Sequence, residues 1–150
     1  MNASSDPKIH GEWSIQALPS CNTILIKGRG GWNGEAAIAY CEEFKDKVIP
    51  LFGVKWACLG YGMDWELGTP DIEVEISRLY EWMVENGCVL QVTVMRSAMS
   101  EAQISRLMNV SEPGYQVFIV DSTEEALQIL ERRGFAVPEA QLTRFIEAPY

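Results

Sequence analysis

Two carboxylates stand close together in the run of residues 63–66, Met-Asp-Trp-Glu, which is the stretch best suited to chemistry. Paired carboxylates can divide the roles of general acid and general base when a partly dry site separates their pKa values. Asp64 and Glu66 are only two residues apart in a predicted loop, and no histidine or lysine stands beside them. We therefore interpret the pair as a solvated rim, and an enzyme using Asp64 or Glu66 is the least favoured function.

The glycine-rich segment from Gly28 to Gly34 invites comparison with phosphate-binding loops. A dinucleotide fingerprint needs Gly-x-Gly-x-x-Gly, so that backbone amides can approach a pyrophosphate. Gly28 and Gly30 have that spacing, but Asn33 occupies the position of the third glycine. A Walker A sequence is absent as well. We interpret the segment as a flexible turn between a hairpin and a helix.

Motifs for a nucleophile or a metal are also missing. The sequence has no Gly-x-Ser-x-Gly and no His-Glu-x-x-His, and its one histidine, His10, precedes the predicted domain. The four cysteines form no Cys-x-x-Cys pair, so we expect reduced thiols that pack as small hydrophobic side chains. The sequence predicts no metal and no cofactor.

Contact with a partner or ligand is a simpler use of this region. Trp32 and Trp65 fall in predicted loops, where a large aromatic side chain can anchor a partner. Each can equally fold down over the sheet edge as a core residue. Thr69 and Pro70 are predicted to be the N-cap and the first residue of a helix. The candidate contact residues are Met63, Asp64, Trp65, Glu66, Thr69 and Trp32.

Alternating strands and helices must position these residues. Strands are predicted at 12–18, 23–27, 54–61, 88–95 and 115–120. Helices are predicted at 35–48 and 70–86, from Ser100 onward, and from Ser122 to Gly134. The third and fourth helices each open on an expected capping box, Ser100 with Gln103 and Ser122 with Glu125. The tail from 134 to 150 carries an apolar helical stripe of Leu142, Phe145 and Ile146.

This order predicts an α/β domain over residues 11–150, after a lead of residues 1–10 that we expect to be disordered. Crossover connections make most strands parallel, so we expect a mostly parallel five-stranded sheet with an N-terminal hairpin and about four helices. In open α/β sheets, ligands bind at the carboxyl ends of the strands. The loop from Gly62 to Gly68 is therefore the predicted site.

Composition narrows the choice of partners. The 150 residues include 47% hydrophobic ones and carry a net charge of −9, which disfavours nucleic acid because no basic run offsets it. No apolar run approaches the 18 residues of a membrane span, and the N-terminus lacks the apolar core of a signal peptide. We expect a cytoplasmic protein.

Four short motifs occur in a familiar order. They are Gly-Gly-Trp-Asn-Gly-Glu (30–35), Gly-Thr-Pro (68–70), Trp-Met-Val-Glu-Asn-Gly (82–87) and Val-Asp-Ser-Thr-Glu-Glu-Ala (120–126). From about Gly11 to Phe135, the chain resembles the STAS-like family of bacterial proteins, which shares its fold with anti-sigma-factor antagonists. A more distant likeness is to CRAL-TRIO lipid-transfer domains.

The resemblance implies a non-catalytic module that binds a protein partner or a small apolar ligand. Anti-sigma-factor antagonists are phosphorylated on a serine at the start of helix two; the nearest residue here is Thr69, which we interpret as an N-cap. Our leading hypothesis is a regulatory or interaction module using residues 62–70. The alternative is a carrier of a small apolar or lipid-like molecule lined by Met63 and Trp65. Because Trp82, Phe145 and Ile146 look surplus to one core, a homodimer is a further hypothesis.

Overall fold

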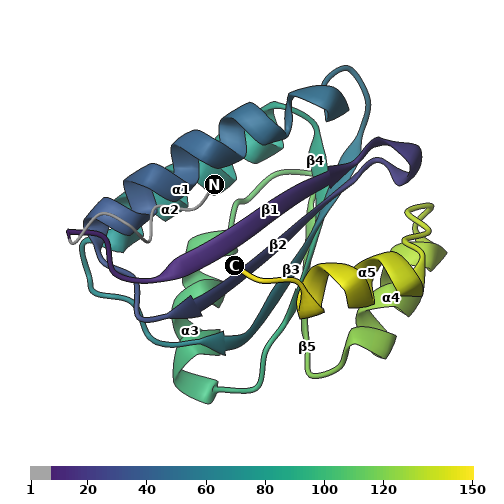
Figure 1. Cartoon of the computed structure of the whole chain (residues 1–150). Coiled ribbons are helices and arrows are strands. Elements are labelled where there is room, and N and C mark those ends of the chain that lie inside the picture. The colour runs from purple at the N-terminus through teal and green to yellow at the C-terminus, as the bar shows by residue number, and fades with distance from the viewer. Residues whose placement is uncertain (1–7) are drawn as a thin grey trace.

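The computed structural model, which describes residues 8–150, is built on a five-stranded sheet with helices on both of its faces (Figure 1). The strands follow one another across the sheet in chain order, β1-β2-β3-β4-β5. β1 is antiparallel to β2, and every later pair is parallel. The α/β class and the N-terminal hairpin are therefore confirmed.

The strands and helices have the following bounds. The strands are β1 (Glu12–Leu18), β2 (Thr23–Gly30), β3 (Trp56–Trp65), β4 (Cys88–Val94) and β5 (Gln116–Val120). The α-helices are α1 (Gly34–Lys47), α2 (Ile72–Glu85), α3 (Ala98–Met108), α4 (Thr123–Arg132) and α5 (Glu139–Glu147). Two short 3₁₀ turns, Pro19–Cys21 and Ile49–Leu51, complete the secondary structure.

The sheet separates two hydrophobic cores, because successive side chains along a strand point to opposite faces. The first core lies against α1, α2 and α3 and includes Trp13, Phe44 and Trp56. The second core lies against α4 and α5 and includes Leu25 and Phe145. Phe145 and Ile146, which looked surplus to one core, thus belong to the second core, whereas Trp82 packs against the first.

The predicted helical tail forms α5, and its apolar stripe packs inward. Leu142 and Phe145 are buried in the second core, and Ile146 packs against it. Trp82 on α2 is half-buried and lies against the ring of Phe52, with centroids 5.9 Å apart. The apolar residues that motivated the homodimer hypothesis are therefore largely covered within one chain.

Several predicted boundaries were wrong. β2 continues to Gly30, so part of the expected glycine loop is strand, and β3 continues to Trp65 instead of ending at Tyr61. Their extensions pair with each other, for example Gly30 with Trp65. α2 begins at Ile72 with Asp71 in the N-cap position, so Thr69 is not the cap.

The predicted capping box at Ser100 and Gln103 was also wrong. Ser97 is the N-cap of α3, and its hydroxyl accepts the Ser100 backbone N–H at 3.4 Å. Ser100 and Gln103 therefore lie inside the helix, where their side chains bond to another segment. At α4 the predicted cap is confirmed, because Ser122 accepts the Glu125 N–H at 3.2 Å.

Part of the predicted lead is attached to the domain. The Asn33 side chain donates to the Lys8 carbonyl at 2.8 Å and accepts the His10 N–H at 3.1 Å. Residues 1–7 of that lead lie outside the described part of the chain. Within residues 8–150, no helix combines the length and the apolar character needed to cross a bilayer.

Candidate functional site

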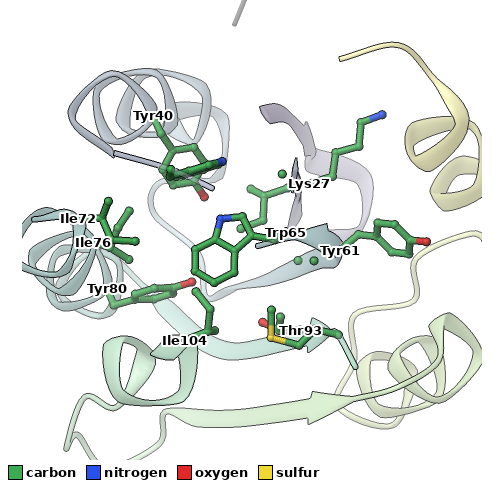
Figure 2. Close-up of a pocket in the computed structure, with 15 residues that line it drawn as sticks. Lys27, Tyr40, Tyr61, Trp65, Ile72, Ile76, Tyr80, Thr93 and Ile104 are labelled. Carbon is green, nitrogen blue, oxygen red and sulfur yellow. The ribbon is translucent and has the colours of Figure 1, made fainter. Parts of the chain in front are cut away.

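A cavity of about 70 Å³ lies between the sheet and the helices of the first core, at the carboxyl halves of the central strands. Residues of β2, β3 and β4 form its floor, and side chains from α1, α2 and α3 form its walls (Figure 2). A single water molecule needs a cavity volume of roughly 10–15 Å³, so this space is larger than a packing defect. Its position agrees with the general rule for ligands in α/β sheets.

Glycines in β3 create this space. Gly60 and Gly62 fall on the face of β3 that carries Cys58 into the first core, so two successive inward positions lack side chains. A Cβ on Gly60 would meet only ordinary contacts, 3.4 Å and 3.5 Å from Ile26 and 3.5 Å from the Thr93 hydroxyl. The floor is therefore open because the residue is small, while the neighbours leave room.

Aromatic rings enclose one side of the cavity. Trp32 packs against Tyr40 with ring centroids 4.9 Å apart and against Trp65 with centroids 6.5 Å apart. Trp32 is 6% exposed and Trp65 8% exposed. Of the two alternatives that the sequence left open, both tryptophans take the core role. Neither is a surface anchor for a partner.

Two tyrosine hydroxyls face the cavity without a hydrogen-bond partner in the described part of the chain. Tyr40 of α1 is 5% exposed and Tyr80 of α2 is 6% exposed. Figure 2 shows both hydroxyls directed towards the space beside Trp65. The indole N–H of Trp65 likewise bonds to no described residue. Burial, with a smaller contribution from nearby ionisable groups, raises the pKa of both tyrosines well above the usual value, so both remain neutral donors.

The other polar side chain on the floor is already satisfied. The Thr93 hydroxyl accepts a hydrogen bond from Gln91 at 3.0 Å and donates to the Met108 sulfur at 3.4 Å. The polar capacity left in the cavity thus belongs to Tyr40, Tyr80 and Trp65.

Lys27 lines the cavity but leaves it uncharged, because its amino group lies on the opposite face of the sheet. The Nζ atom donates to the carbonyls of Ile146 and Ala148 and lies 4.3 Å from the centroid of the Tyr150 ring. Figure 2 shows Lys27 and Tyr61 pointing away from Trp65. Burial is the main cause that lowers the pKa of Lys27, followed by the charge of Arg29.

The remaining predicted contact residues lie outside the cavity. Met63 packs against the second core. Asp64 and Glu66 are exposed and border an open groove together with Arg29, which forms a 2.9 Å salt bridge to Glu12. The structure therefore brings the two carboxylates to one groove, apart from the aromatic cavity.

Thr69 is exposed as well, in the connection between β3 and α2. Its hydroxyl is within hydrogen-bond reach of the Asp71 carboxylate and of the Trp32 carbonyl, at 3.3 Å from the latter. It therefore links its own connection to the turn between β2 and α1, and does not cap α2.

A buried glutamine fastens the segment that follows Trp65. Gln103 of α3 accepts the Gly68 N–H at 3.0 Å and donates to the Gly68 carbonyl at 3.2 Å. The neighbouring Ser100 hydroxyl donates to the Trp65 carbonyl at 3.5 Å. The helix α3 thus fixes the backbone on both sides of Leu67 and holds the Trp65 ring over the cavity.

Comparisons with known proteins add no family to this description. No family model matches the chain, and no curated protein matches it at a significant level. Among residues 8–150, no group of three or more His, Cys, Asp or Glu side chains is placed to hold a metal ion.

Sequence reasoning missed Tyr40, Tyr80 and Gln103 as site residues. The two tyrosines lie on the buried faces of α1 and α2. Their one distinguishing signal was the polar end of a tyrosine within an apolar stripe. That signal does not indicate whether the hydroxyl finds a partner.

Proposed function

We propose that this chain is a non-catalytic module that binds a small, largely apolar molecule in the cavity beneath α1 and α2. The observation that carries the proposal is the pair of hydroxyls of Tyr40 and Tyr80. Both residues are buried, but their hydroxyls reach the cavity surface, lack a partner among the described residues and face an apolar space. A bound molecule with a suitable polar atom can pair with them in place of water.

The cavity walls favour an apolar body for this molecule. The cavity is bordered by aromatic and branched apolar side chains. The aromatic ones are Trp32, Tyr40, Trp65 and Tyr80, and the branched ones are Ile26, Ile72, Ile76 and Ile104. Ligand sites in proteins are mostly apolar, with a few polar groups that fix orientation. The arrangement therefore suits a carrier or a sensor of a small neutral compound.

A second function, interaction with a protein partner, is favoured by exposed apolar side chains near the same end of α2. Leu67 is 47% exposed in the connection that follows Trp65, and Val74 is 55% exposed on α2. Because Trp65 both covers the cavity and begins this connection, a bound molecule that moves the ring would also move Leu67. A cytoplasmic regulatory module of STAS-like type would combine the two functions, and the order of the strands and helices supports that finer proposal.

Xenon is a suitable probe of the cavity, because it enters apolar cavities without a specific polar contact. We expect xenon pressure to shift the indole N–H signals of Trp32 and Trp65 in nitrogen-15 NMR spectra. The variant Gly60→Ala places a methyl group in the floor at ordinary contact distances, and the shifts should be smaller in this variant.

The control is Leu67→Ala, which changes the exposed connection and leaves the cavity wall intact. It should respond to xenon like the wild type. Xenon shifts that are absent from the wild-type indole signals would show that the space is closed to ligands and would refute the proposal. For the second function, Leu67→Ala should abolish capture of a partner from cell extract, while Gln16→Ala on exposed β1 surface should not.

A further inference from the structure

We propose that the ligand is a neutral compound with a hydrogen-bond-accepting carbonyl oxygen, held by the hydroxyls of Tyr40 and Tyr80. This inference rests on the proposed function and names the ligand class of the same cavity. It starts from three polar groups that face the space and have no partner in the described part of the chain, which are the two hydroxyls and the indole N–H of Trp65.

The balance of donors and acceptors favours an accepting ligand. An indole nitrogen only donates, and each tyrosine hydroxyl donates one hydrogen bond and can also accept. The site therefore holds three N–H or O–H donors. A carbonyl oxygen has two lone pairs and can accept from both tyrosines at once. A hydrocarbon would leave all three donors without a partner.

Charge excludes a carboxylate as the preferred ligand. Among residues 8–150, the only cationic side chain that borders the cavity is Lys27, and its amino group bonds to Ile146 and Ala148 on the other face of the sheet. An anion in the cavity would lose its hydration without gaining an ion pair, which is costly. Because burial raises the pKa of Tyr40 and Tyr80, both hydroxyls keep their protons for donation at neutral pH.

Size limits the group that enters the cavity. The space of about 70 Å³ is smaller than the engineered cavity of roughly 150 Å³ that admits benzene. A ketone, aldehyde or ester of a few heavy atoms is therefore the right scale, either alone or as the end of a longer molecule.

Three probes of the same shape separate these properties. The first is 2-butanone. The second is 2-methyl-1-butene, which has a methylene group in place of the carbonyl oxygen of 2-butanone. The third is propanoate, which has a charged oxygen in place of a methyl group of 2-butanone. Water solvates the ketone better than the alkene, so their absolute affinities do not isolate the hydrogen bonds. The informative quantity is the change in each affinity when a tyrosine hydroxyl is removed.

Each affinity would be measured by NMR titration of the Trp65 indole signal in wild type, Tyr40→Phe and Tyr80→Phe. The substitutions remove one unpartnered oxygen and keep the ring, so the fold should persist. Loss of one neutral hydrogen bond should weaken 2-butanone by about three- to tenfold. The affinity for 2-methyl-1-butene should stay the same or increase. Tyr61→Phe is the matched control, since its side chain points away from Trp65, and it should change neither affinity.

The outcomes distinguish this inference from the proposed function. Equal effects of the tyrosine substitutions on ketone and alkene would overturn the carbonyl assignment, while binding of the alkene would still support an apolar site. Propanoate bound as tightly as 2-butanone at pH 7 would overturn neutrality. Shifts with xenon but none with 2-butanone would reject the carbonyl ligand alone, whereas no response to any probe would reject both proposals.

Discussion

The indole rings of Trp32 and Trp65 meet edge to face, with centroids 6.5 Å apart and planes at 82°. Trp32 follows the end of β2, and Trp65 is the last residue of β3, so the contact joins two parallel strands at their carboxyl ends. A backbone hydrogen bond from Glu66 to the Gly30 carbonyl, at 3.1 Å, reinforces the same junction. The ring pair therefore closes one side of the cavity and stabilises the region where a ligand would enter.

The first prediction concerns the energetic coupling of this ring pair. Trp32→Leu and Trp65→Leu should each lower the free energy of unfolding by about 1–3 kcal/mol. Because edge-to-face pairs contribute beyond their buried area, a double-mutant cycle should give a coupling energy of about 0.5–1.5 kcal/mol. Urea unfolding of the four proteins measures it. Trp32→Leu combined with Trp82→Leu is the control and should be additive, since Trp82 packs against Phe52 instead.

Local sequence signals predicted much of the fold. The bounds of β1 follow from alternation, and the end of α2 follows from Gly87, whose φ of +106° suits a residue without a Cβ. The extension of β3 was missed because Gly-Met-Asp has little strand propensity. It forms because Arg29 and Gly30 of β2 pair with it, and such a distant partner leaves no local signal.

Only part of the candidate site was accessible from the sequence. The rule for strand ends led to Trp65, but predicted it in a loop. The neighbouring Gln103 resembled half of a capping box, because Ser100 stands three residues before it, whereas the actual cap is Ser97. The role of Gln103 depends on Gly68, which lies 35 residues away and approaches it only in the folded chain.

The second prediction tests the attachment of the connection between β3 and α2. Gln103→Leu should lower the free energy of unfolding by about 1–3 kcal/mol, because the buried N–H and carbonyl of Gly68 lose their partner. Hydrogen exchange of the Gly68 amide should accelerate at the same time. Gln128→Leu, on the exposed side of α4, serves as the control. Unchanged exchange at Gly68 would show that Gln103 does not hold this segment.

The third prediction concerns the four free cysteines. Burial raises the pKa of Cys41 and Cys88 to about 12, and it raises the pKa of Cys58 well above its usual value. Since the thiolate is the reactive form, these thiols should resist iodoacetamide in the native protein at pH 8. Cys21 is half-buried and should be the first to react.

Mass spectrometry of the alkylated protein measures the order of reaction. We expect a single adduct, on Cys21, under native conditions. The same protein alkylated in concentrated urea is the unfolded control and should carry four adducts. Early modification of Cys58 would contradict the buried position of this residue in the first core.

The last prediction concerns alkaline stability. Burial, aided by nearby thiols and tyrosines, raises the pKa of Tyr80 in the folded protein, while an unfolded tyrosine ionises near pH 10. Below pH 10 Tyr80 is protonated in both the folded and the unfolded chain, and its full contribution to the free energy of unfolding is present. Above pH 10 the unfolded chain releases a proton that the folded chain retains, so the free energy of unfolding falls as pH rises. One such group changes the slope by at most about 1.4 kcal/mol per pH unit.

Tyr80→Phe should therefore make the decline shallower between pH 10 and 11, as measured by urea unfolding. Cys41 and Cys88 have a raised pKa as well, so some decline should remain. Parallel curves for wild type and Tyr80→Phe would mean that the Tyr80 hydroxyl reaches water in the folded protein, and that the cavity is more hydrated than its apolar walls indicate.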